Sequence, residues 1–153
     1  GMTSVVVPGG RARVVRNQAG GVQVIDDTYN ANPASMGAAF NMLSDLAGDA
    51  RRIAALGTMF ELGEATEKMH REVGRVAAAS GIKVVYAAGP QAEAMRAGAE
   101  AGGAKAFAFE DVEVLIESIS GELRGGDWLL VKGSRGMRME RVVAAVTQKQ
   151  GDS

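Results

Sequence analysis

The chain has 153 residues, with 17 basic and 18 acidic side chains and a formal net charge of −1. Apolar residues at 46% and charged residues at 23% are ordinary values for a globular domain with a hydrophobic core, so they exclude a wholly disordered chain. The absence of cysteine excludes disulfides and thiolate metal sites. Since the sequence has no basic stripe, we expect no nucleic-acid partner, and since it has no long apolar run, we expect no membrane insertion.

In chain order, an extended segment at residues 13–16 comes first, and we expect it to pair with the next strand through a turn at Gly20 and Gly21. Nearly continuous apolar runs, typical of strands buried on both faces of a parallel sheet, predict strands at residues 22–25, 53–56, 84–88, 106–109 and 128–131. Helical periodicity predicts helices at residues 33–46, 64–79, 91–101, 112–123 and 139–146. The alternation predicts a three-layer, Rossmann-like α/β domain with a mostly parallel sheet, preceded by a short N-terminal strand or hairpin. We expect this single domain to span residues 1–153, with Gly1 as a remnant of tag removal.

The helix at 64–79 is expected to turn Met69, Val73 and Val76 toward the core. His70, the only histidine, lies among charged residues of this helix, which favours a surface or capping position. Four methionines at core spacing are interpreted as packing residues: Met36, Met42, Met69 and Met95.

Polar or glycine-containing sequences follow four of the predicted strands, at residues 26–33, 57–63, 89–90 and 132–136. Because parallel strands all point the same way, these loops should share one edge of the sheet. Ligands of open α/β sheets bind beyond the carboxyl ends of the strands, so we expect the functional site at this edge.

The first of these loops leaves several interpretations open. Asn32, followed by Pro33, is either the N-cap of the next helix or a site residue. Asp26 and Asp27 are a metal pair, an acceptor for ribose hydroxyls, or charge favoured near a helix N-terminus.

The last loop, Lys-Gly-Ser-Arg at residues 132–135, combines two cations with a hydroxyl just before the final helix, which favours an anion site for a carboxylate or phosphate. The alternative is that Ser134 caps the helix while Lys132 and Arg135 are solvated. Neither a phosphate-binding P-loop nor the Gly-x-Gly-x-x-Gly dinucleotide pattern occurs, so we recognise no complete catalytic apparatus in this chain.

Three motifs together resemble the C-terminal domain of the Mur ligases, and more narrowly its D-alanyl-D-alanine-adding branch. They are Tyr-Asn-Ala-Asn-Pro at 29–33, Gly-Thr-Met-Phe-Glu-Leu-Gly at 57–63 and Lys-Gly-Ser-Arg at 132–135, within a resemblance that runs from about Arg11 to Val146. The resemblance implies the third domain of a cytoplasmic ligase, whose P-loop and Mg ligands lie outside this chain. It also implies ATP, UDP-MurNAc-tripeptide and D-Ala-D-Ala as substrates, in peptidoglycan precursor synthesis. The isolated domain is expected to be inactive.

Carried over residue by residue, the resemblance assigns Arg11 to the ATP phosphates, with Arg13 as the alternative, because the register of this segment is open. It assigns Asp26 and Asp27 to the nucleotide ribose, and puts Tyr29 and Asn30 near the adenine or the dipeptide.

The remaining assignments concern the incoming dipeptide. The resemblance turns Lys132, Ser134 and Arg135 toward it, and Asn32 and Thr58 are further candidates for substrate binding. Thr58 stands where the family usually has aspartate, so a role for its side chain in binding a cation is not carried over.

The competing hypothesis is a free-standing flavodoxin-like module that binds a nucleotide or an anion at the same edge.

Overall fold

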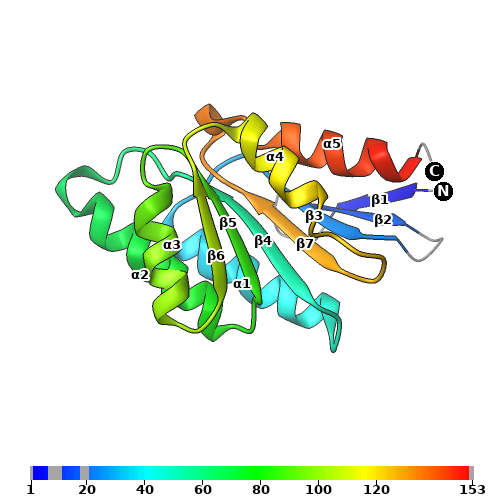
Figure 1. The fold of residues 1–153 in the computed structure, drawn as a ribbon, viewed down its shortest axis with the longest axis horizontal. Helices are drawn as coiled ribbons and strands as arrows, with labels where there is room; N and C mark the ends of the chain where they lie inside the picture. Colours follow the sequence, from blue (N-terminus) through cyan, green and yellow to red (C-terminus); the bar gives the residue numbers. More distant parts are fainter. Residues whose placement is uncertain (1, 7–11, 18–20, 152–153) are drawn as a thin grey trace.

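The computed structural model describes residues 2–6, 12–17 and 21–151. They form a seven-stranded sheet with helices on both faces, in the order β1-β2-β3-β7-β4-β5-β6 (Figure 1). The strands are β1 (Met2–Val6), β2 (Arg13–Asn17), β3 (Gln23–Asp27), β4 (Arg52–Gly57), β5 (Val84–Ala88), β6 (Lys105–Phe109) and β7 (Trp128–Lys132). The predicted α/β class with a mostly parallel sheet is confirmed.

Pairing within the sheet divides into an antiparallel edge and a parallel centre. Strands β1, β2 and β3 pair antiparallel, and β3, β7, β4, β5 and β6 pair parallel. The predicted pairing of the segment at 13–16 with the first central strand is confirmed, since Val14 faces Ile25 and Val15 faces Val24. The predicted turn includes Gly20, which lies outside the described residues.

Alternating side chains of the central strands feed two separate cores. The helices are α1 (Pro33–Ala47), α2 (Thr66–Ala79), α3 (Ala92–Ala101), α4 (Val112–Ser120) and α5 (Glu140–Gly151), with short 3₁₀ turns η1 (Gly63–Ala65) and η2 (Arg135–Met137). One core lies under α1, α2 and α3 and includes Ile25, Leu56 and Leu130. The other lies under α4 and α5 and includes Val24 and Val131. Strands with apolar residues on both faces therefore become the middle layer of three.

Helices α2 and α3 pack closely because each has a glycine at the contact. A Cβ atom at Gly74 would overlap the backbone oxygen of Met95, and a Cβ atom at Gly98 would overlap that of Arg71. These glycines thus allow the two helix backbones to approach each other.

The inward face of α2 differs from the prediction. His70, Val73, Gly74 and Ala77 are buried, whereas Met69 is 37% exposed. The predictions for Met69 and His70 were therefore wrong, because the buried stripe of α2 begins at His70 and follows the spacing i, i+3, i+4, i+7.

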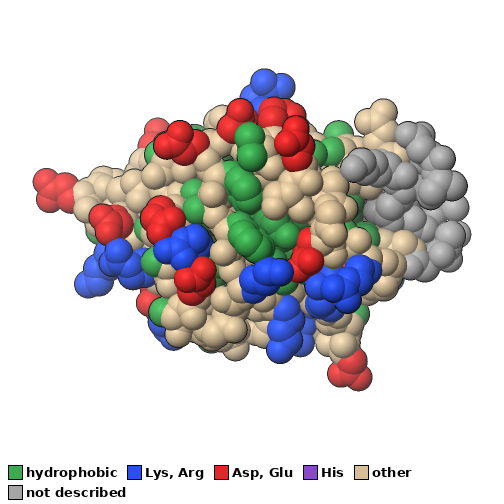
Figure 2. Space-filling model, in the orientation of Figure 1, with side chains coloured by type: hydrophobic (Ala, Val, Ile, Leu, Met, Phe, Trp, Pro, Cys, Tyr) green, Lys and Arg blue, Asp and Glu red, His purple; other side chains and the backbone are tan. Residues whose placement is uncertain are grey.

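The outer face of β6 and α4 is only partly covered. Phe107 and Phe109 pack against Tyr86, and Val114 is 48% exposed. Figure 2 shows hydrophobic side chains gathered in the middle of this face and no histidine on it.

Within the described part of the chain, no helix has the length and apolar character needed to cross a membrane.

Candidate functional site

The carboxyl ends of the central strands bring the predicted loops together. Asp27 at the end of β3 is level with Lys132 at the end of β7, and Lys132 is level with Leu56 near the end of β4. Gly57 in turn is level with Ala88 at the end of β5. The loops that follow these strands share one edge of the sheet, as the sequence predicted.

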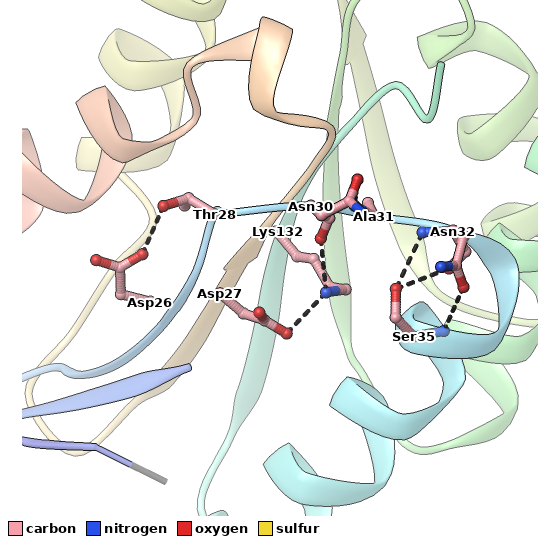
Figure 3. A network of polar contacts seen from close by, with 8 residues as sticks. All are labelled: Asp26, Asp27, Thr28, Asn30, Ala31, Asn32, Ser35 and Lys132. Carbon is pink, nitrogen blue, oxygen red and sulfur yellow. Dashed lines mark hydrogen bonds and ion pairs between the residues drawn. The ribbon is translucent and has the colours of Figure 1, made fainter. Parts of the chain in front are cut away.

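Lys132 connects the last central strand to the first loop. Its side chain is 3% exposed, and its Nζ atom lies 2.8 Å from Oδ2 of Asp27 and 2.9 Å from the backbone oxygen of Asn30 (Figure 3). The alternative of a solvated Lys132 is thus wrong. The ammonium neutralises Asp27 and holds the chain at Asn30, so it acts first on the shape of the loop.

Asp26 has a separate set of partners. Arg13 Nη2 donates to Asp26 Oδ2 at 2.8 Å, and the hydroxyl of Thr28 donates to Oδ1 at 2.7 Å. Successive side chains of a strand point to opposite faces, so Asp26 and Asp27 engage different neighbours. The described residues contain no cluster of three or more histidine and carboxylate side chains suited to a metal ion.

Asn32 is the N-cap of α1. Its side chain accepts a hydrogen bond from the Ser35 N–H at 2.8 Å, and the Ser35 hydroxyl accepts one from the Asn32 N–H at 3.0 Å (Figure 3). This reciprocal capping box confirms the capping interpretation of Asn32. It also fixes the direction in which residues 28–31 leave the sheet.

An open cleft of about 450 Å³ lies at this edge. Its lining residues are Arg13, Asp26, Thr28, Tyr29, Arg135 and Glu140. The guanidinium carbon of Arg135 lies 5.2 Å from the centre of the Tyr29 ring, within the range of a cation–π contact. Among the residues that the structure describes, Arg135 has no carboxylate partner, whereas Arg13 is paired with Asp26. Arg135 is therefore the cleft cation whose charge is available to an anionic ligand.

Thr58 is not among the residues that line the cleft. The side chain is buried, its hydroxyl donates to the Ala88 oxygen at 3.0 Å, and it accepts from the Gln91 N–H at 3.1 Å. As a donor and as an acceptor, the hydroxyl thus holds the turn after β5. These two hydrogen bonds give the Thr58 hydroxyl a structural role at this position.

Ser134 joins the loop after β7 to the loop after β4. The Phe60 N–H donates to Ser134 Oγ at 2.8 Å, and the Ser134 N–H donates to the Thr58 oxygen at 3.2 Å. Its side chain does not cap η2, so the capping alternative for Ser134 is wrong.

His70 is a residue of this edge that sequence reasoning missed. It is fully buried, and its Nε2 atom accepts a hydrogen bond from the Met59 N–H at 2.8 Å. Burial lowers the pKa of His70 below the ordinary histidine value, so the neutral imidazole is favoured. In the sequence, residues 70, 73, 74 and 77 have the i, i+3, i+4, i+7 spacing of one helix face, and this spacing could have revealed that His70 is buried.

An open α/β sheet with an arginine- and tyrosine-lined cleft at its carboxyl edge defines a Rossmann-like domain with a candidate ligand site. The model of the family "Mur ligase, glutamate ligase domain" matches residues 10–135. The chain therefore belongs to the Mur ligase family. This membership favours a ligase domain over the competing free-standing flavodoxin-like module.

Relatives with curated names agree with the family. The chain is 38% identical over 146 residues to UDP-N-acetylmuramoyl-tripeptide–D-alanyl-D-alanine ligase of Treponema pallidum, with 93% of this chain and 30% of the relative covered. It is 36% identical over 127 residues to the ligase of the same name from Escherichia coli, with 82% and 27% covered. The chain thus spans about 30% of the length of the first of these relatives.

Solved structures give the same fold. MurF ligase from Thermotoga maritima, solved in complex with ADP, superposes with a TM-score of 0.76 at 30% identity, with 97% of this chain and 32% of that chain covered. MurF from Acinetobacter baumannii superposes with a TM-score of 0.74 at 31% identity, with 88% and 30% covered. The similarity extends over nearly the whole described fold.

Proposed function

We propose that this chain is one domain, the C-terminal third of an ATP-dependent amide ligase that adds D-Ala-D-Ala to UDP-MurNAc-tripeptide. The observation that carries the proposal is the cleft itself, where Tyr29 of one family motif and Arg135 of another lie in contact. The names of the curated relatives support it, as does the share of about 30% of their length that the chain spans. With ATP as a substrate, we expect the activity in the cytoplasm.

In the proposed reaction, ATP phosphorylates the terminal carboxylate of the tripeptide. The amino group of D-Ala-D-Ala then attacks the acyl carbon, so that a new amide forms and phosphate leaves. This domain would bring in the dipeptide and close over the nucleotide, which excludes water from the hydrolysable acyl phosphate. Since the P-loop and the Mg ligands are expected outside this chain, we expect the isolated chain to hydrolyse no ATP.

The residues at the cleft suit an anionic nucleotide with a planar base. Asp26 and Asp27 are proposed acceptors for the ribose hydroxyls, with Tyr29 and Asn30 near the adenine or the dipeptide. Asp26 and Tyr29 line the cleft, which supports the assignment for these two residues, whereas Asp27 and Asn30 are not among its lining residues. Arg11, which we propose for the ATP phosphates, lies outside the described residues.

For the dipeptide, the contacts divide the work among the residues of the last loop. Arg135 lines the cleft without a carboxylate partner among the described residues, so we assign it to the dipeptide carboxylate. Lys132 and Ser134 have partners in neighbouring loops. We therefore assign Lys132 to holding Asn30 in place, and Ser134 to holding the loop of Arg135 in place. Thr58 and Asn32 support loop geometry from further away.

The test uses the full-length ligase that contains this chain, with ADP formation measured as a function of D-Ala-D-Ala concentration. We expect ADP formation to require both UDP-MurNAc-tripeptide and the dipeptide. An Arg135→Gln variant should raise the KM for D-Ala-D-Ala by roughly tenfold or more, since one charge-assisted hydrogen bond is lost. Arg124→Gln, a change at an exposed residue outside the cleft, is the matched control and should leave this KM unchanged. Full activity without the dipeptide would contradict the proposed function.

A further inference from the structure

His70 is a buried polar residue that lies outside the cleft and on a different element from the family motifs that line it. It is in the first half of α2, it is fully buried, and both of its ring nitrogens have partners. The Met59 N–H can only donate, so Nε2 must be the acceptor and carry no proton. The proton is then on Nδ1, which lies 2.7 Å from the Thr66 oxygen, an acceptor. The neutral imidazole thus satisfies both contacts at once.

The contact with Met59 fixes the start of the loop after β4. Met59 is 1% exposed, so its N–H has no access to water and depends on the imidazole. Two residues later, Glu61 has a positive φ of 65°, a conformation that residues other than glycine rarely adopt. His70 therefore holds the backbone in place two residues before this turn.

From Met59 the connection continues to the residues of the cleft. The next residue, Phe60, donates its N–H to Ser134 Oγ at 2.8 Å, and its ring lies against Gly136. Ser134 and Gly136 flank Arg135, the cation of the cleft. A continuous chain of contacts therefore runs from the interior of α2 to both neighbours of Arg135.

We propose that His70 is a positioning residue for ligand binding: it fixes Met59 and Phe60, and Phe60 in turn fixes the loop that presents Arg135 to the cleft. The proposal rests on the proposed function for the identity of the ligand, since the ligand is taken to be D-Ala-D-Ala. A role in core packing alone would require only the volume of the ring. The proposed role requires an acceptor at the position of Nε2.

Two substitutions separate these roles. In His70→Gln, the side-chain oxygen can occupy the place of Nε2 and accept from Met59, whereas in His70→Asn the shorter amide reaches only the place of Nδ1, near Thr66. Both variants lose the ring. We expect His70→Asn to raise the KM for D-Ala-D-Ala about tenfold, the effect of about one hydrogen bond, and His70→Gln to restore most of that loss. The KM for UDP-MurNAc-tripeptide should stay unchanged in both.

The second measurement needs no activity. In amide NMR spectra of this chain, His70→Asn should shift Phe60 and Arg135, and His70→Gln should leave them near their original positions. Equal shifts and equal KM values in the two variants would overturn the proposal, because the ring volume would then be what matters. A ligase with no dipeptide-dependent ADP formation would instead refute the proposed function, and the NMR comparison would still decide the role of His70.

A third variant tests the same connection from the other side, without a change at His70. Ser134→Ala removes the acceptor for Phe60 without a change in α2, and it should reproduce the shifts of Phe60 and Arg135. Since both residues act through Phe60, the effects of His70→Asn and Ser134→Ala on KM should be less than additive in the double variant. Strict additivity would overturn the proposed connection.

Discussion

The ammonium of Lys132 lies 2.8 Å from the carboxylate of Asp27, and only 3% of the Lys132 side chain and 17% of the Asp27 side chain are exposed. This pair joins the carboxyl ends of β7 and β3 across two neighbouring strands. The same ammonium donates to the backbone of Asn30, so one buried charge sets the path of the loop that contains Tyr29. Removal of either partner leaves a charge in a site that is poorly solvated.

Replacement of Lys132 by methionine should therefore destabilise the chain strongly. Breaking a buried ion pair by removing one partner costs about 3 kcal/mol or more. The free energy of unfolding, measured by urea denaturation, should fall by this amount. The control is Arg71→Met, which breaks the exposed pair with Glu67 on α2 and should cost less than about 0.5 kcal/mol. Similar decreases in the free energy of unfolding in both variants would show that the burial of Lys132 does not contribute to stability.

The next prediction concerns Thr58, which stands where the Mur ligase family usually has aspartate. Thr58→Val keeps the shape but leaves the Gln91 N–H without its acceptor, which should cost about 1–2 kcal/mol. Thr58→Asp should cost more than Thr58→Val, because a carboxylate in this buried place would face the Ala88 oxygen, to which the hydroxyl now donates. Urea denaturation of both variants, with Thr58→Ser as the control that keeps the hydroxyl, measures the order. An aspartate variant as stable as the original chain would show that this turn relaxes to accept a charge.

The sheet could be predicted from the sequence because its signals are local. Apolar runs such as residues 53–56 and 128–131 are typical of strands buried on both faces, and parallel strands bring their carboxyl ends to one edge. The candidate loops were therefore located correctly. The strand Met2–Val6 was not predicted, since the first extended segment was expected at residues 13–16. An edge strand of this kind is specified by the partner that it pairs with.

Which way each side chain of the site points could not be predicted, because it depends on contacts between distant residues. Lys132 and Asp27 are 105 residues apart in sequence, and nothing local to Lys132 shows that its charge is neutralised. The same limit applies to His70, whose partner Met59 lies on a loop. Charged neighbours in the sequence of α2 suggested a solvated histidine, whereas the helix periodicity, read one residue further along, puts it in the core.

The two arginines before β3 should differ in a kinetic experiment. Arg13 is paired with Asp26 at 2.8 Å, so its charge is already engaged, and this supports Arg11 as the arginine that meets the ATP phosphates. In the full-length ligase, Arg11→Ala should lower kcat more than it changes the KM for D-Ala-D-Ala, since it removes an interaction with the transferring phosphoryl group. Arg13→Ala should have the smaller effect on kcat. The opposite order would assign the phosphate contact to Arg13 and correct the register.

The stability of the chain should depend on pH through His70. Burial lowers the pKa of His70 in the folded chain below the ordinary value of 6.5, so the unfolded chain binds its proton at higher pH than the folded chain does. The stabilisation by neutral His70 is therefore fully present above pH 6.5 and is lost as the pH falls toward the folded pKa. Over that window the free energy of unfolding should decrease by up to about 1.4 kcal/mol per pH unit for this one proton.

Urea denaturation between pH 7.5 and pH 5 measures this dependence, and His70→Gln is the control, because glutamine keeps an acceptor for Met59 and does not titrate. Carboxylates titrate in both proteins, so the difference between the two curves isolates the histidine. In the original chain, the amide signals of Met59 and Phe60 should shift as the pH falls through the folded pKa of His70, at the lower end of this window, because protonation of Nε2 removes the acceptor of the Met59 N–H. Parallel stability curves for the two proteins would show that His70 keeps the same proton affinity in the folded and unfolded chain, which contradicts its burial.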